Sequence, residues 1–418
     1  MCSALVFTDG FDAQSMGFVA PALAAQLHLA RTEIGPLLSS GLFGMMIGAL
    51  IFGPLADRFG RKPIMVISVF LFGVLSLLTA TATSFQELLV YRLLTGLGLG
   101  GAMPNAIALT GEYTPRRSRA TGIMTMFVGF TLGGASGGFV AAALISRFGW
   151  QSVFIVGGIF PCVAAAVALA VMPESIRFLV LKGGQQRRVA YYLSRIAPNA
   201  GISPEMNFEV EEQRSCGFVV KHLFTDGRAA VTLLLWVMFF MSLLDLYFLN
   251  GWLPTVMSDV GVPVRTAILI STLFQVGGII GNLFLGRLID RNMSFRVLGL
   301  IYLLSGVCVF LIGGAGGSIP LLVASVLATG VTVLGGQSSS NALAASYYPT
   351  AIRTTGLGWA LGIGRVGSIV GPILGGLLLT ITPETRRVFW AAAIPPLIAT
   401  AAAFAVASII KKKELRKV

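Results

Sequence analysis

The sequence reads GPLADRFGRK from Gly53 to Lys62, and a shorter version of the same pattern, GRLIDR, runs from Gly286 to Arg291. Both stretches come at the end of an apolar segment, and both place an aspartate directly before an arginine. Weak similarity between two distant parts of one chain indicates an internal structural repeat. We therefore expect two halves that contain the same arrangement of elements.

Twelve apolar segments surround these two stretches, six before a polar break and six after it. They cover residues 1–24, 34–56, 63–82, 86–110, 119–145, 150–172, 229–257, 266–289, 296–314, 319–340, 355–380 and 388–410. An α-helix needs about 20 mostly apolar residues to cross the hydrocarbon core of a bilayer. Only 11% of the residues are charged, whereas about 25% are charged in a soluble domain. The sequence predicts an all-α membrane protein with twelve transmembrane helices in two six-helix halves.

The polar break divides the chain. It is mixed in charge and contains glycine and proline, as expected of a loop. We expect an N-terminal six-helix half at 1–172, a central cytoplasmic loop at 173–228, a C-terminal six-helix half at 229–410 and a basic cytoplasmic tail at 411–418.

The basic residues of the short loops predict the orientation in the membrane. Under a twelve-helix count they gather on one side, at Arg58–Lys62, Arg116–Arg119, Arg287–Arg296, Arg353 and Lys411–Lys417, with Arg386 and Arg387 against the trend. Loops rich in lysine and arginine remain in the cytoplasm. We expect both termini on the cytoplasmic side of a bacterial inner membrane. The net charge of +13 is then explained by topology, and nucleic acid is not an expected partner.

Sequence features that would point to a metal site, an enzyme or a cleaved leader do not stand out. The cysteines Cys2, Cys162, Cys216 and Cys308 are scattered and form no C-x-x-C pair, so we expect no metal site and no cofactor. We find no Ser/His/Asp set and therefore do not expect an enzyme. The first apolar stretch contains Asp9 and Asp12, so we expect a retained helix and no signal peptide.

The first apolar segment carries the run Asp9-Gly10-Phe11-Asp12. In a helix, side chains three positions apart lie on the same face. Two carboxyl groups close together in a low-dielectric site cannot both ionise cheaply, so we expect one of them to hold a proton. The pair is a candidate proton carrier. The alternative is that Asp9 lies near the membrane interface and only caps the helix.

Two arginines interrupt apolar segments. Arg92 begins the pattern Arg92-x-x-x-Gly96-x-Gly98, and Arg365 lies within the eleventh segment. A cation at this depth is costly and usually faces a cavity or an acidic partner. Arg365 and Arg92 are candidates for binding a substrate carboxylate. Asn105 and Gln337 are further candidates to line a cavity, although most such polar groups form hydrogen bonds between helices.

Glycines spaced four residues apart form a further pattern. Examples are Gly133 with Gly137, Gly277 with Gly281, and Gly367 with Gly371. Small residues at this spacing let two membrane helices approach closely. We interpret these positions as packing contacts.

The Gly53–Lys62 motif and the fourth-segment arginine resemble the major facilitator superfamily. Over nearly the whole chain the sequence further resembles the aromatic acid:proton symporters, a family that includes the 4-hydroxybenzoate and protocatechuate transporters. The runs that carry this resemblance are Asp9–Asp12, Gly17–Pro21, Gly96–Gly100, Met103–Ile107, Gly111–Tyr113, Ser346–Thr350, Ile352–Arg353 and Gly362–Arg365. Members of this family usually carry further residues ahead of the Asp-Gly-Phe-Asp run, so we expect the first residue given to be internal.

The resemblance implies the major facilitator fold and the roles of several residues. Asp9, Asp12, Arg92 and Glu112 would matter for proton coupling. The superfamily's charge-relay latch would hold the halves together through Asp57, Arg58, Arg61, Asp290, Arg291 and Arg353. The implied function is import of a benzoate-type aromatic carboxylate with protons, and the implied partners are this substrate, protons and membrane lipid. Another organic acid, such as a muconate-like acid or a dicarboxylate, drug export, and a membrane sensor for aromatic acids are the alternatives.

Overall fold

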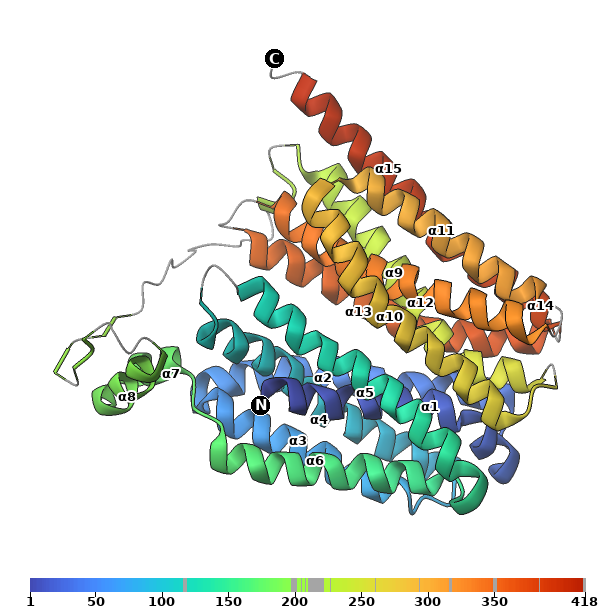
Figure 1. Ribbon diagram of the computed structural model, residues 1–418, viewed down its shortest axis with the longest axis horizontal. Helices are drawn as coiled ribbons and strands as arrows, with labels where there is room; N and C mark the ends of the chain where they lie inside the picture. Colours follow the sequence, from blue (N-terminus) through green and yellow to red (C-terminus); the bar gives the residue numbers. More distant parts are fainter. Residues whose placement is uncertain are drawn as a thin grey trace.

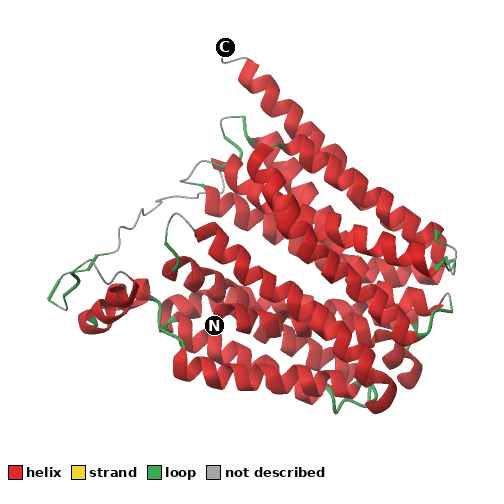
Figure 2. Ribbon diagram, viewed as in Figure 1, coloured by secondary structure: helices red, strands yellow, loops and turns green. Residues whose placement is uncertain are grey.

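The computed structural model describes residues 1–115, 119–196, 201–203, 205–206, 208–209, 222–225, 227–259, 261–292, 294–315, 318–348, 352–382 and 384–415. The regular secondary structure of these residues is helical throughout (Figure 2). The helices form two groups that follow each other along the chain (Figure 1).

The first group contains six long helices. They are α1 (Cys2–Leu27), α2 (Arg31–Phe59), α3 (Arg61–Thr79), α4 (Phe85–Tyr113), α5 (Arg119–Phe148) and α6 (Gln151–Val171). Within this group α1 packs on α5, α2 packs on α4, and α3 packs on both α4 and α6. Glycines make the α2–α4 contact possible, since a Cβ on Gly44 or Gly48 would overlap the backbone of α4.

The second group contains α9 (Ala229–Asp259), α10 (Val264–Asn292), α11 (Phe295–Gly314), α12 (Ile319–Tyr347), α13 (Arg353–Ile381), α14 (Thr385–Ala392) and α15 (Ile394–Leu415). Here α9 packs on α13, α10 on α12, and α11 on α15. The last apolar segment is divided at Ala393, two residues before Pro395, and Pro395 and Pro396 lack the N–H that would continue a helix. Because α15 runs to Leu415, the first residues of the predicted tail are helical.

The segment between the groups differs from the loop that the sequence predicts, because it contains the short helices α7 (Ile176–Lys182) and α8 (Gln186–Ile196). Leu179 of α7 and Val189 and Ala190 of α8 are buried. Gly183 and Gly184 lie between the two helices and adopt positive φ values. A few apolar residues at helical spacing were enough to form these helices in an otherwise polar stretch.

Eleven helices in the described part of the chain are long and apolar enough to cross a membrane. The remaining predicted span, α1, has 26 residues, which is about 39 Å at 1.5 Å per residue and sufficient for a bilayer core. It is less apolar than the other spans because it carries Asp9, Asp12 and Gln14. These three side chains are buried within the protein.

The two groups meet through α2 with α13, α5 with α10, and α1 with α9. Ser39 of α2 donates a hydrogen bond to the carbonyl oxygen of Ile369 (2.7 Å), and Arg31 forms an ion pair with Asp259 of α9 (3.0 Å). Both contacts involve the beginning of α2, which lies at the end of the molecule remote from α7 and α8 (Figure 1). The halves are therefore held together at the end opposite the central segment.

Candidate functional site

A buried ion pair joins α1 and α4. The Nη1 atom of Arg92 lies 3.1 Å from each carboxylate oxygen of Asp12. The two side chains are 4% and 0% exposed. Ser76 of α3 donates a hydrogen bond to Asp12 (3.2 Å), and the guanidinium of Arg92 lies over the ring of Phe154 in α6 at 5.4 Å. Four helices thus surround one charge pair that is removed from water, and the loss of either partner would leave a buried charge.

Asp9 lies one helical turn before Asp12 and has a different environment. It is fully buried, and neither of its carboxylate oxygens has a hydrogen-bond partner among the described residues. It lies within electrostatic range of both Asp12 and Arg365. Arg365 of α13 donates a hydrogen bond to the hydroxyl of Tyr247 in α9 (3.4 Å). Asp9 of the first half is therefore within electrostatic range of Asp12 on the same helix and of Arg365 in the second half.

A small pocket lies beside these charges, between the two halves. Arg92 and Gln14 contribute polar groups from the first half, and Tyr247 and Asn250 contribute them from the second. The remaining walls are largely apolar and include Met16, Leu38, Leu42, Met45, Leu99 and Pro372. A cation beside apolar walls and a few amide and hydroxyl groups is suited to an amphipathic anion.

Asn105 and Gln337 do not line this pocket. Asn105 donates a hydrogen bond to the carbonyl oxygen of Gly101 on its own helix (2.7 Å). The side-chain oxygen of Gln337 accepts a hydrogen bond from Ser242 (2.7 Å). Both side chains are therefore engaged within their own half, and their role in substrate binding stays a prediction.

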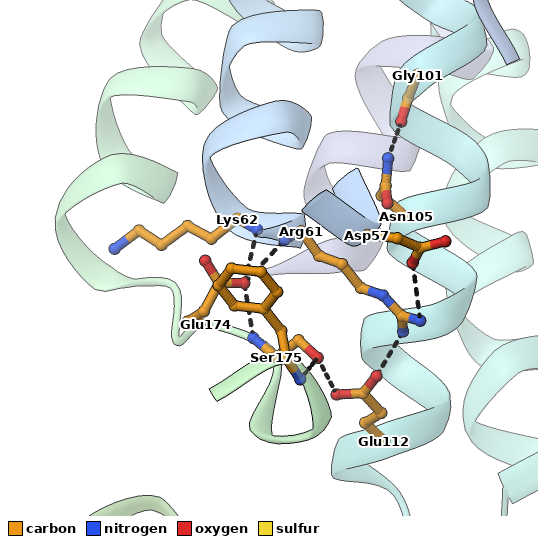
Figure 3. A network of polar contacts seen from close by, with 9 residues as sticks. Asp57, Arg61, Lys62, Gly101, Asn105, Glu112, Glu174 and Ser175 are labelled. Atoms are coloured by element: carbon orange, nitrogen blue, oxygen red, sulfur yellow. Dashed lines mark hydrogen bonds and ion pairs between the residues drawn. The ribbon is translucent and has the colours of Figure 1, made fainter. Parts of the chain in front are cut away.

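A second polar network lies at the other end of α4 (Figure 3). Arg61, at the start of α3, forms a short ion pair with Glu112 near the end of α4. The other carboxylate oxygen of Glu112 accepts a hydrogen bond from Ser175 (2.7 Å). Asp57 lies 3.9 Å from Arg61 but its side chain is 78% exposed. The network joins α2, α3, α4 and the segment before α7.

Glu174 is a central residue of this network, and our sequence reasoning did not single it out. One of its carboxylate oxygens accepts three backbone N–H groups, from Arg61 (2.9 Å), Lys62 (3.0 Å) and Ser175 (2.8 Å). A carboxylate at a helix N-terminus satisfies free N–H groups and is favoured by the helix dipole. The available signal was an acid directly after the sixth apolar segment, in the run Pro173-Glu174-Ser175.

Glycine at position 60 is required by the same arrangement. Gly60 connects α2 to α3 with a φ of 106°, and a Cβ there would press against the Glu174 carboxylate. Only glycine adopts this backbone conformation without strain. The glycine of the Gly53–Lys62 motif therefore serves both the turn and the approach of Glu174.

The predicted latch between the halves is described only on one side. Arg58 lies over the ring of Phe59 at 5.4 Å, and Arg61 is paired within its own half. The side chains of Asp290, Arg291 and Arg353 lie outside the described residues. The latch stays a prediction.

The sequence matches the family model of the Major Facilitator Superfamily over residues 2–243 and again over residues 235–417. The chain belongs to the major facilitator superfamily. This membership, with the all-helical structure and its many apolar helices, confirms the predicted fold class and a multi-pass membrane protein.

Among known members of the superfamily, the chain is 45% identical to the 4-hydroxybenzoate transporter PcaK of Pseudomonas aeruginosa, over 96% of this chain and 90% of that protein. It is 39% identical to the gallate transporter of Pseudomonas putida, over 97% and 90% of the two chains. The xylose transporter XylE from Escherichia coli, solved in an inward open conformation, has the same fold with a TM-score of 0.76, 17% identity and 96% and 93% coverage. The relatives are transporters, which confirms the expectation that the chain is not an enzyme.

Proposed function

We propose that this protein imports a small aromatic carboxylate together with protons, by alternating access across the bacterial cytoplasmic membrane. The observation that carries the proposal is the buried Asp12–Arg92 pair, which lies beside the pocket between the halves and close to the unpartnered Asp9. The names of the PcaK and gallate relatives support the substrate class. Protonation and anion binding would act on the same group of charges.

The substrate would lie in the pocket between the halves. Its ring would contact the apolar walls, and its carboxylate would bind a guanidinium, which offers two parallel N–H donors. Arg365 does not line the pocket in this conformation, but its described hydrogen bond goes to the neutral hydroxyl of Tyr247, which does, and its charge would be available to the substrate. Arg92 already balances the charge of Asp12. Tyr247, Asn250 and Gln14 would contact substituents on the ring.

Protons would enter through Asp9 and Asp12. Protonation of Asp12 would remove the partner of Arg92 and leave that cation available to the substrate. Moving a monovalent anion into a cell with a negative interior costs about 2.3 kcal/mol of free energy per 100 mV of membrane potential. One co-transported proton cancels the charge, and a second adds a driving force. The two first-helix carboxyl groups provide the sites for such coupling.

The contacts between the halves support an inward-facing state, if the side that carries α7 and α8 is cytoplasmic. The halves meet at the opposite end, through Arg31 with Asp259 and Ser39 with Ile369. Figure 1 places both ends of the chain on the side of α7 and α8, in agreement with two cytoplasmic termini. In this state the Arg61–Glu112 pair would hold the cytoplasmic ends of one half together, and Asp57 would be free to engage the other half when the transporter turns outward.

The test is uptake of labelled 4-hydroxybenzoate by cells that express the chain, with and without a protonophore. We expect accumulation against a gradient that the protonophore abolishes. Asp9→Asn and Asp12→Asn should abolish uphill uptake and leave the protein in the membrane, whereas Glu205→Gln on the central segment should behave as wild type. Accumulation that is insensitive to the protonophore would contradict proton coupling. No competition by any aromatic acid, with the protein present in the membrane, would contradict the substrate class.

A further inference from the structure

The two halves can be aligned through their closest helix contacts. In the first half, a Cβ on Gly133 of α5 would overlap the carbonyl oxygen of Phe7 in α1, and Gly137 faces the carbonyl oxygen of Phe11. In the second half, Gly367 of α13 meets the carbonyl oxygen of Phe240 in α9, and Gly371 meets that of Leu244. In each pair both the glycines and the facing residues are four positions apart. Gly129 of α5 meets the carbonyl oxygen of Ser3 one turn earlier, so the glycine contacts alone would allow a shift of four residues. The register is fixed by the prolines inside the two helices, because Pro21 of α1 and Pro254 of α9 lie ten residues after Phe11 and Leu244, respectively. Phe11 and Leu244 therefore occupy equivalent positions.

A second pair of contacts gives the same alignment. Gly44 of α2 meets the carbonyl oxygen of Leu93 in α4, and Gly277 of α10 meets that of Leu327 in α12. Four residues later, Gly48 of α2 and Gly281 of α10 again meet equivalent carbonyl oxygens. Leu93 and Leu327 are therefore equivalent.

The charged pair of the first half can now be located in the second. Asp12 directly follows Phe11, and its equivalent is the residue after Leu244, which is Asp245. Arg92 directly precedes Leu93, and its equivalent is the residue before Leu327, which is Val326. The carboxyl group is thus repeated in the second half while its cation is replaced by a fully buried valine.

Asp245 has hydroxyl and amide groups around it in place of a cation. It is 2% exposed, and its Oδ1 atom has no hydrogen-bond partner among the described residues. Tyr302 of α11 lies within electrostatic range of Asp245 and interacts with Ser242. The hydroxyl of Tyr302 is 2.6 Å from that of Ser340, and Ser242 bonds to Gln337. Hydroxyl groups can donate to a carboxylate or accept from a carboxylic acid, so these neighbours suit either protonation state.

Charged groups on the helices that pack against α9 do not balance Asp245. Arg365 of α13 contacts Tyr247, two residues further along α9, and Asp12 of α1 is paired with Arg92. The only titratable residue of α12 is its last one, Tyr347. Among the described residues, none of the ion pairs involves Asp245. The charged residues of the packed helices are Asp9 and Asp12 on α1, Arg265, Arg287, Asp290 and Arg291 on α10, Arg353 and Arg365 on α13, Arg386 and Arg387 on α14, and Lys411, Lys412, Lys413 and Glu414 on α15.

We propose that Asp245 is a second proton-binding site, which takes up and releases one proton in each transport cycle. An unpaired carboxylate buried at this depth would be very costly, so in the observed conformation the group carries its proton. Tyr247 and Asn250 on the same helix line the pocket between the halves. Movement of the halves therefore changes the surroundings of α9, and access of water to Asp245 would let the proton leave and the carboxylate form.

This proposal rests on the proposed function, because it assigns the second of two co-transported protons. The first half would bind a proton in competition with the Arg92 cation, and the second half would bind one with no competing cation. The two sites would then differ in what surrounds the carboxyl group, an ion pair in the first half and neutral polar groups in the second. This difference is the property that an experiment can detect.

The first experiment needs no transport. Infrared difference spectroscopy of the purified protein in lipid detects the carbonyl band of a protonated carboxyl group, and pH is varied across the titration. We expect one component of this band in the wild type to disappear as pH rises and to be missing in Asp245→Asn, while any contribution of Asp9 or Asp12 remains. A spectrum of Asp245→Asn identical to that of the wild type at every pH would overturn the proposal, whether or not the protein transports an aromatic acid.

The second experiment measures stoichiometry in proteoliposomes at an imposed pH gradient. Loss of one coupled proton lowers the accumulation ratio about tenfold for each unit of pH gradient. We expect this loss in Asp245→Asn, with exchange of labelled against unlabelled substrate retained. Glu205→Gln, the same acid-to-amide change at an exposed position of the central segment, is the control and should keep the wild-type ratio. An unchanged ratio in Asp245→Asn would overturn the proposal, whereas failure of wild-type exchange would count against the proposed function alone.

A third variant covers the case in which Asp245→Asn does not fold. Tyr302→Phe removes the phenol hydroxyl near Asp245 and keeps the ring. We expect the infrared band to persist and to titrate over a shifted pH range. A band that titrates as in the wild type would overturn its assignment to Asp245.

Discussion

The two halves of this transporter share their helix packing and differ in their buried charges. The first half contains an ion pair, Asp12 with Arg92, and at its end a network built on Arg61, Glu112 and Glu174. The second half repeats the carboxyl group at Asp245, with Tyr302 within electrostatic range and no cation paired to it; Tyr302 interacts with Ser242, which bonds to Gln337. Equivalent helix positions in the two halves thus have different charged neighbours. Gene repeats conserve the contacts that determine helix approach, while the chemistry at a given position is free to diverge.

The largest effect is expected when the buried cation of the first half, Arg92, is removed. Arg92→Gln leaves Asp12 buried without its partner, which costs about 3–5 kcal/mol when one member of a buried pair is lost. We expect loss of uptake and a lower unfolding temperature in detergent, measured by thermal denaturation. The double variant Asp12→Asn/Arg92→Gln should recover most of the stability and none of the uphill uptake. Full stability of Arg92→Gln alone would contradict the pairing.

The next largest effect concerns the cation across the interface. Arg365→Lys keeps the charge and loses the two-pronged geometry, and Arg365→Gln loses both. A hydrogen bond to a charged group contributes about 1.5–3 kcal/mol, so we expect KM for uptake to rise roughly ten- to a hundredfold in Arg365→Gln. Initial rates over a range of substrate concentrations measure this change. An effect on the maximal rate alone, with KM unchanged, would argue against carboxylate binding.

Glu174 tests the network at the end of the first half. Glu174→Gln removes the charge that accepts two N–H groups at the start of α3 and one from Ser175, and we expect a loss of about 1–3 kcal/mol of stability. Thermal denaturation and initial uptake rates are the measurements. Glu205→Gln, an exposed acid on the central segment, is the control and should be neutral. An equal effect of both substitutions would indicate a general loss of charge and no specific cap.

The smallest effect is expected at Asp57. Its side chain is 78% exposed and lies 3.9 Å from Arg61, and exposed ion pairs contribute about 0–1 kcal/mol. Asp57→Asn should therefore leave thermal stability in this conformation unchanged, while uptake slows because the opposite conformation loses its latch. A clear drop in thermal stability without a change in uptake would contradict the role of Asp57 as a latch in the opposite conformation.

Much of the fold could be predicted from the sequence, because membrane spans must be long, apolar and helical. The repeat of Gly53–Lys62 at Gly286–Arg291 also predicted two equivalent halves. The helices α7 and α8 could not be predicted with the same ease, since their few buried residues, such as Leu179 and Val189, lie among charged neighbours. The first helix was predicted correctly as a helix although its polar residues make it less apolar than the other spans.

The site was predictable in its charges and not in its pairings. A charge inside a membrane span needs a partner, so Asp9, Asp12, Arg92 and Arg365 were evident candidates. Which aspartate binds Arg92 depends on the rotation of α1 about its axis, and sequence spacing does not specify that rotation. Glu174 was missed because its three N–H partners come mainly from a helix start far away in the chain.

The ion pair between Arg31 and Asp259 links this molecule to the salt content of its surroundings. Its side chains are 40% and 28% exposed, and such partly exposed pairs contribute about 0.2–1 kcal/mol. That free energy corresponds to a ratio of up to about five between two conformers. Dissolved ions screen exposed charges within about 8–10 Å. The ionic strength of the medium would thus influence the resting balance between the inward-facing and outward-facing conformations, even when no substrate is present.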